Sequence, residues 1–153
     1  IIYYCFGSAH SSVLAAAIHT KMLPEDRIPE NQEIKDIPHY DKTDSCLIGT
    51  PFYFGEDDNS NQIYILGMGK AKKIVKNLIN SFFKLENIPE QEVLLINTLK
   101  HVNILVKIGG FLSRGLGIIF PGRYLTIYGL KKNYFEFVQL TQQVKTQSEI
   151  GIA

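Results

Sequence analysis

The sequence predicts an α/β protein with a mostly parallel sheet and helices on both faces. We expect a three-layer, Rossmann-like or P-loop-like arrangement with an inserted β-hairpin. Short apolar runs alternate with helical patterns along the chain, and glycine-rich or polar loops follow several of the runs. With 153 residues, 45% of them hydrophobic and 20% charged, the chain is expected to form a single domain over residues 1–153.

The first 19 residues predict a strand, a tight loop and a helix. Residues 1–6 are apolar, aromatic and β-branched, which is typical of a buried strand. Residues 7–12 are small and polar. Three consecutive alanines then favour a helix from Ser11 to about Met22, with Ser11 or Ser12 near its N-cap and Pro24 ending it.

A proline-broken segment over residues 23–46 follows the first helix. It contains a possible short helix over residues 30–37 and a polar stretch over residues 39–44, which we expect to fold over a ligand site. Residues 46–54 and 62–66 have strand character and flank a turn-like stretch. They therefore predict an antiparallel hairpin.

The rest of the chain alternates helices and strands. We expect a helix over residues 71–85, a strand over 92–97, a helix over 99–114, a strand over 116–120 and a final helix over 131–146. Gly109 and Gly110 weaken the third of these elements, and close packing against a neighbour is one reason to accept them there.

Four loops are expected at the carboxyl edge of the sheet, where open α/β sheets bind ligands. A helix N-terminus has unpaired N–H groups and a partial positive charge, so residues 7–12 predict a phosphate or similar anion site. The predicted anion-binding residues are Gly7, Ser8, Ala9, Ser11, Ser12, Gly67, Gly69, Lys70, Asn97, Thr98 and Arg123. Arg114 is a further candidate for an anion clamp.

Three residues are candidate catalytic groups. Cys5 ends the first strand near a helix N-terminus, and the alternative is that it is a small buried apolar residue. His10 suits acid–base chemistry, or orders the loop. Asp41 offers a general acid from the inserted segment, or stabilises a local turn. The sequence has no Cys/His cluster with zinc-ligand spacing and indicates no particular cofactor.

The first loop is locally similar to two phosphate-binding loops. Residues 7–12 resemble the end of a Walker A motif, with His10 in place of the lysine. Residues 5–12 also resemble the loop of low-molecular-weight tyrosine phosphatases and arsenate reductases in Cys5, Gly7 and Ser12. Ser11 replaces the arginine that clamps phosphate in that loop.

A wider resemblance rests on six motifs, which lie at residues 4–19, 37–42, 48–51, 64–69, 97–99 and 109–114. Together they resemble the bacterial DUF3189 family, a domain of unknown function, over nearly the whole chain. The resemblance implies a bacterial protein with the fold of that family, and it supplies no mechanism.

Composition narrows the possible partners and location. A net charge of +1 gives no bulk electrostatic reason to expect nucleic acid or an anionic membrane. There is no long apolar run or signal peptide, and two cysteines do not make a disulfide scaffold, so we expect a cytoplasmic protein. The predicted function is binding of a phosphorylated small molecule or nucleotide by a transferase or hydrolase. The alternative is a non-catalytic regulatory or protein-interaction module.

Overall fold

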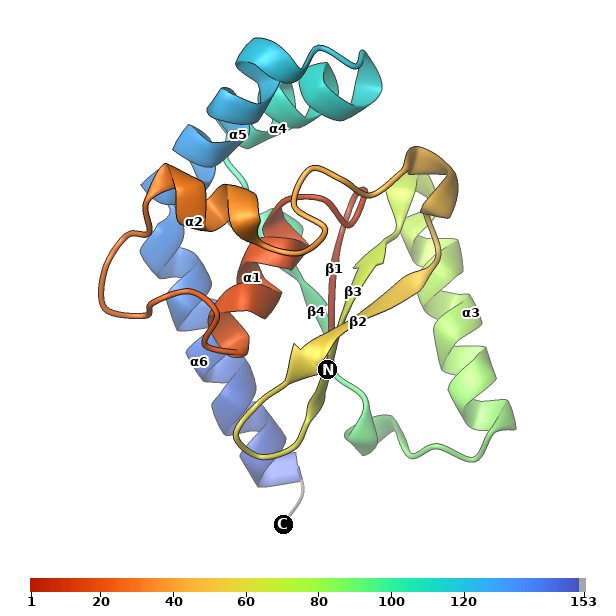
Figure 1. Ribbon diagram of the computed structural model, residues 1–153. Coiled ribbons are helices and arrows are strands. Elements are labelled where there is room, and N and C mark those ends of the chain that lie inside the picture. The colour runs from red at the N-terminus through yellow and green to blue at the C-terminus, as the bar shows by residue number, and fades with distance from the viewer. Residues whose placement is uncertain (152–153) are drawn as a thin grey trace.

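The fold is organised around a mixed four-stranded sheet with the strand order β2-β3-β1-β4. The computed structural model describes residues 1–151 (Figure 1). The central strand β1 (Ile2–Cys5) pairs in parallel with β3 (Gln62–Gly67) and with β4 (Leu95–Asn97). β2 (Pro51–Glu56) pairs antiparallel with β3, which confirms the predicted hairpin.

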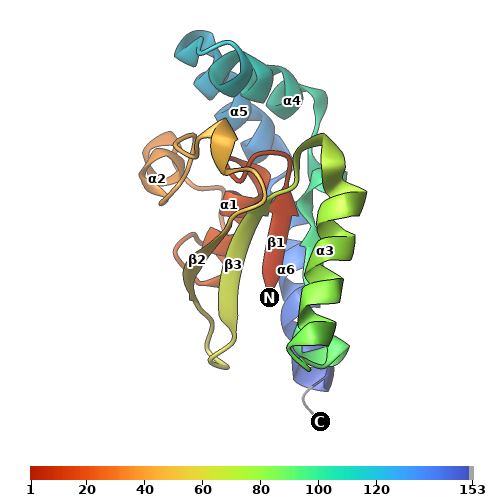
Figure 2. The ribbon, with the colours of Figure 1, turned by 90° about the vertical axis from the view of Figure 1, so that its right-hand side faces the viewer.

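Helices cover both faces of this sheet, as predicted. α1 and α6 lie on one face and α3 lies on the other, while α4 and α5 form a helical hairpin beyond the carboxyl ends of the parallel strands (Figures 1 and 2). The helices are α1 (Ser11–His19), α2 (Asn31–Asp36), α3 (Lys72–Leu85), α4 (Ile104–Gly110), α5 (Ile119–Lys132) and α6 (Tyr134–Gly151). Among the described residues, no helix has the length and apolarity needed to cross a membrane.

The core has two parts because side chains alternate between the two faces of a strand. On β1, Tyr3 belongs to the larger cluster with α1 and α6, whereas Ile2 and Tyr4 belong to the smaller cluster under α3. Every residue of α1 is buried. The three alanines of this helix are fully buried, and their small side chains suit a helix enclosed on all sides.

The predicted strand over residues 116–120 is wrong. These residues connect a π-helical turn (Phe111–Gly115) to α5 and include the first residues of α5. A short apolar run does not by itself distinguish a strand from other buried or packed segments. Here Leu116, Ile118, Ile119 and Phe120 are exposed, and the sheet ends at β4.

Close packing of α4 against α5 explains the helical hairpin. A Cβ atom on Gly109 would lie 2.6 Å from the carbonyl oxygen of Gly122, so only glycine permits this backbone approach. The expected reason for the weakened helix is thus confirmed.

Several predicted boundaries are also wrong. α1 ends at His19, before the predicted Met22, and β2 starts only at Pro51. The predicted helix over residues 99–114 begins at Ile104, because the side chain of Asn103 accepts hydrogen bonds from the first amides of α4. The predicted final helix is two helices, which meet at Asn133.

Candidate functional site

The loop between β1 and α1 leads into a buried helix N-terminus without a side-chain cap. The N-cap residue is His10, and its side chain makes no capping hydrogen bond; Ser11 and Ser12 lie next to the N-cap, as predicted, as the first two residues of the helix. Ser8 has a left-handed φ of 51°. Within the described chain, the backbone N–H groups of residues 7–13 donate no hydrogen bond. Buried amides normally have acceptors, so this group of donors is available to a ligand.

Two of the loop hydroxyls are occupied by neighbouring protein groups. Thr98 Oγ1 donates to the carbonyl of Tyr4 (2.9 Å), so Ser11 Oγ donates to Thr98 Oγ1 (2.9 Å). Ser12 Oγ lies 3.1 Å from the buried sulfur of Cys5.

The hydroxyl of Ser8 differs from the other two. It is buried and has no hydrogen-bond partner among the described residues. It lies over Gly67, where a Cβ atom would come within 3.1 Å of Ser8 Oγ. The unpartnered hydroxyl of Ser8 therefore adds a further unpaired polar group beside the amides of the loop.

The inserted segment packs on the loop and satisfies its carbonyl groups. The backbone N–H of Asp41 donates to the carbonyl of Ala9 (2.9 Å), and the hydroxyl of Thr43 donates to the carbonyl of Ser8 (2.8 Å). The carbonyls of Ser8 and Ala9 are therefore paired, while the amides of the loop remain unpaired within the described chain.

The carboxylate of Asp41 is the electrostatic centre of this region. His10 Nε2 lies 3.2 Å from Oδ1, and Arg123 Nε donates to Oδ2 at 2.8 Å. Burial by itself raises the pKa of Asp41, but the hydrogen bonds from His10 and Arg123 outweigh burial and lower it to about 2. Asp41 is thus ionised at neutral pH.

One ring nitrogen of His10 has no hydrogen-bond partner among the described residues. A carboxylate only accepts hydrogen bonds, so Nε2 carries the hydrogen that is donated to Asp41. The other nitrogen, Nδ1, faces Gly110, and a Cβ atom at position 110 would lie 3.4 Å from it. The ring of Tyr40 packs edge-on against the imidazole at 5.5 Å, and burial raises the pKa of this tyrosine.

The two candidate arginine clamps bind the inserted segment. Arg123 pairs with the Asp41 side chain, and Arg114 donates to the backbone carbonyls of Asp41 and Thr43. Both cations therefore hold residues 41–43 against the helical hairpin. Their predicted contact with an anion stays a prediction.

The remaining predicted residues divide into two groups. Gly67, Gly69 and Thr98 adjoin the loop, and the amide of Gly69 donates to the carbonyl of Phe6 (2.8 Å). Asn97 instead accepts from the amide of Leu99 (3.1 Å) and caps its own turn. Lys70 is exposed and forms no hydrogen bond or ion pair with the described part of the chain.

Sequence reasoning missed Thr43 and Gly110. Thr43 lies in the polar stretch expected to fold over a ligand site, but nothing in that stretch singles it out, and Gly110 reaches the loop only through the fold of the helical hairpin. Within residues 1–151, no group of His, Cys, Asp and Glu side chains is arranged to hold a metal ion.

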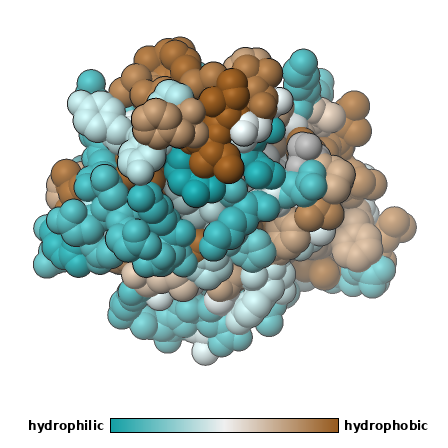
Figure 3. All heavy atoms as spheres, turned by 45° about the horizontal axis from the view of Figure 1, so that its top comes forward, coloured by the Kyte–Doolittle hydropathy of each residue, from teal (hydrophilic) through white to brown (hydrophobic). Residues whose placement is uncertain are grey.

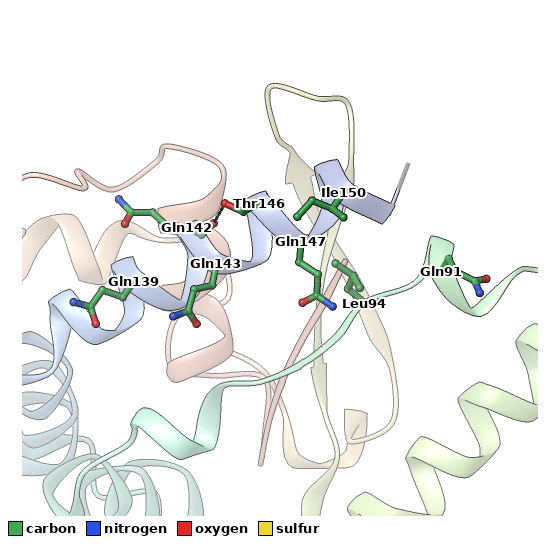
Figure 4. Close-up of a pocket in the computed structure, with 8 residues that line it drawn as sticks. All are labelled: Gln91, Leu94, Gln139, Gln142, Gln143, Thr146, Gln147 and Ile150. Atoms are coloured by element: carbon green, nitrogen blue, oxygen red, sulfur yellow. Dashed lines mark hydrogen bonds between the residues drawn. The ribbon is translucent and has the colours of Figure 1, made fainter. Parts of the chain in front are cut away.

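Two grooves flank the edge strand β4, away from this loop. One of about 690 Å³ lies beside α6, and Figure 4 shows Gln147 of that helix next to Leu94. The other, of about 310 Å³, lies beside α3. Neither groove is lined by a predicted site residue.

Comparison with known proteins gives one match. A family described as "Protein of unknown function (DUF3189)" matches residues 1–146. No curated protein and no solved structure is significantly similar to the chain. The similarity of residues 5–12 to nucleotide P-loops and to low-molecular-weight phosphatases is not shown by these comparisons.

Proposed function

The chain belongs to the DUF3189 family, and from the geometry of its β1–α1 loop we propose that it binds the phosphate group of a small molecule or nucleotide. The observation that carries this proposal is the set of unpaired amides at residues 7–13, in front of a buried and uncapped helix. Such a helix end favours negative charge through both its N–H groups and its dipole.

Other features of the loop support an anion in particular. Ser8 has a left-handed backbone conformation. Such a residue allows successive backbone N–H groups to point toward a common concave site. The unpartnered hydroxyl of Ser8 adds one more donor. Because the carbonyls of Ser8 and Ala9 are already hydrogen-bonded to the insert, their negative ends are neutralised.

We further propose that His10 moves a proton at the bound phosphate, so that the protein acts as a transferase or hydrolase. Asp41 holds Nε2, which leaves Nδ1 to accept a proton from an attacking hydroxyl or water. The attacking oxygen bonds to phosphorus as the bond from phosphorus to the leaving oxygen breaks, and the leaving oxygen takes a proton from water. A positioned base of this kind contributes roughly 100- to 10,000-fold to a rate.

A non-catalytic binding module is the second candidate, and the arginines favour it. Phosphoryl transfer needs stabilisation of the charge on the transferring group, commonly by an arginine. Arg114 and Arg123 are both engaged with residues 41–43. This arrangement suits recognition of an anion better than stabilisation of a transition state.

The proposal is tested by placing a charge at the mouth of the loop. A Cβ atom at Gly7 has no neighbour within 4 Å, so Gly7→Asp adds a carboxylate without a clash, and Gly7→Asn is the uncharged control. Inorganic phosphate, sulfate and a panel of nucleotides are titrated in thermal unfolding. A ligand at 100 times its Kd stabilises the native state by about 2.7 kcal/mol.

We expect stabilisation of the wild type and of Gly7→Asn, and none of Gly7→Asp. A wild type that no anion stabilises, or an equal response of both variants, contradicts the proposed site. If binding holds, turnover of phosphorylated substrates that is lost in His10→Ala supports catalysis. Binding without turnover supports the non-catalytic module.

A further inference from the structure

Charge is distributed very unevenly along this chain. Residues 70–85 and 93–135 contain 11 of the 16 Lys and Arg residues and none of the 15 Asp and Glu residues. These two segments, which include α3 and the α4–α5 hairpin, carry +11, and the rest of the chain carries −10. The net charge of +1 is therefore the sum of two segments that are strongly positive and a remainder that is strongly negative.

The same two segments expose most of the large apolar side chains. They hold 14 of the 21 exposed large hydrophobic residues of the described chain. At the tip of the hairpin, five are exposed within ten residues: Phe111, Leu116, Ile118, Ile119 and Phe120. On α3 the exposed residues are Ile74, Leu78, Phe82 and Leu85.

These segments lie at the top of the molecule and along one side of it. In Figure 1 the hairpin tip projects above the sheet and toward the side on which α3 lies, whereas in Figure 2 the tip projects away from α3. Figure 3 shows hydrophobic atoms along the top and the right of the molecule, over the hairpin and α3. Hydrophilic atoms cover the front of that view, where α2 and the inserted segment lie. We call the exposed side chains of residues 70–85 and 93–135 the apolar–basic face.

We propose that the apolar–basic face docks on the surface of an anionic lipid bilayer. Exposed aliphatic and aromatic side chains gain free energy by entering the interface between headgroups and acyl chains. Lysine and arginine beside them are attracted by anionic headgroups. On α4, Lys107 lies between Ile104 and Ile108 in sequence and is exposed together with them, so charge and apolar surface reach the bilayer together.

Other occupants fit the face less well. A second copy of the chain would bring two basic faces together, and neither segment contains a carboxylate that could pair with the lysines of the other copy. Nucleic acid would match the charge, but it offers no apolar counterpart for an exposed aliphatic tip. The anionic bilayer satisfies both properties. This inference does not depend on the proposed anion site.

The test is co-sedimentation of the full chain with vesicles of phosphatidylcholine alone and with vesicles that also contain phosphatidylglycerol, at low and at high salt. Phe120→Ser and Ile74→Ser remove apolar groups that are 75% and 72% exposed. Ile150→Ser is the matched control, since Ile150 is 72% exposed but lies outside the face. Lys107→Gln tests charge, with exposed Lys42→Gln as its control.

We expect salt-sensitive binding to the anionic vesicles only. Phe120→Ser should weaken it roughly tenfold or more, and Lys107→Gln about fivefold. Ile74→Ser should also weaken it, while both control variants bind like the wild type. All these side chains are exposed, so thermal unfolding should show that the variants stay folded.

Four outcomes overturn the proposal. They are absence of binding to anionic vesicles at low salt, equal binding to neutral vesicles, equal loss in the control variants, and a wild-type dimer that Phe120→Ser dissociates without any vesicle binding. Light scattering of the wild type and of Phe120→Ser separates the last outcome from the others.

Discussion

The two ends of α1 each carry a histidine paired with an aspartate, and the pairs differ in what they leave free. At the far end, His19 is fully buried and both ring nitrogens are occupied. Nε2 donates to Asp57 (3.0 Å), and Nδ1 accepts from the hydroxyl of Tyr3 (2.6 Å). At the near end, His10 has one nitrogen bonded to Asp41 and its side chain is 11% exposed.

This difference separates a structural pair from a candidate functional pair. Burial lowers the pKa of His19, so the ring stays neutral inside the closed Tyr3–His19–Asp57 chain. Nothing further can bind there. The His10–Asp41 pair lies beside unpaired amides and keeps a free nitrogen, so a ligand can complete it. A histidine–aspartate pair is thus part of the packed core at one end of α1, while the pair at the other end can still bind a ligand.

The largest expected effect is at the closed pair. Asp57→Ala removes the acceptor of His19 Nε2 and of the backbone amides of Asn59 and Asn61, each 2.9 Å from Oδ1. The buried ring of His19 and two amides of the turn lose their acceptor at once, so we expect a loss of about 3 kcal/mol in the free energy of unfolding, measured with urea. Asp58→Ala is the control, because the exposed Asp58 pairs only with the exposed Lys21. Equal losses in the two variants would show that the network does not stabilise the fold.

The open pair should show a smaller effect that depends on pH. The pKa of Asp41 falls from 3.8 to about 2 on folding, so its ionised form stabilises the native state by about 2 kcal/mol. This contribution is complete above pH 4 and is lost as the pH falls from about 4 to about 2, because the unfolded chain binds the proton first. Asp41→Asn should remove it.

The measurement for Asp41 is urea unfolding of wild type and Asp41→Asn across that acid range. The stability difference should be near 2 kcal/mol at neutral pH and should shrink as the pH approaches about 2. Asp26→Asn, at an exposed carboxylate, serves as the control. If the difference in the free energy of unfolding between wild type and Asp41→Asn stays constant with pH, the ionised form of Asp41 does not stabilise the native state through its ion pairs.

Much of this architecture was predictable because it follows from local patterns. The apolar run before residues 7–12 and the alanines after it specify β1, the loop and α1 without any long-range information. The hairpin and α3 follow from alternation and helical periodicity in the same way. The strand predicted over residues 116–120 is wrong because these apolar residues form the exposed tip of the α4–α5 hairpin, and an apolar run does not show whether it will be buried in a sheet.

The site was predictable only in part for a similar reason. The loop and His10 lie in one continuous stretch, and Asp41 lies in a segment with visible ligand chemistry. The choice of partners was not visible, since Arg123 is 82 residues from Asp41 in sequence and contacts it only through the helical hairpin. The hydroxyl of Ser11, which the sequence suggested as an anion ligand, is hydrogen-bonded to Thr98 in the folded protein.

The smallest expected effect concerns the tyrosine that closes the structural pair. Tyr3→Phe removes the hydroxyl that donates to His19 Nδ1 and leaves that nitrogen without a donor, at a cost of about 1 kcal/mol in the free energy of unfolding. Nitrogen-detected NMR should still find the hydrogen on Nε2 of His19, because Asp57 continues to accept it. Binding of anions at residues 7–13 should be unchanged, since Tyr3 contacts the opposite end of α1. A Tyr3→Phe variant that lost anion binding would show that the two pairs are coupled through α1, and the separation between a closed structural pair and an open one would then fail.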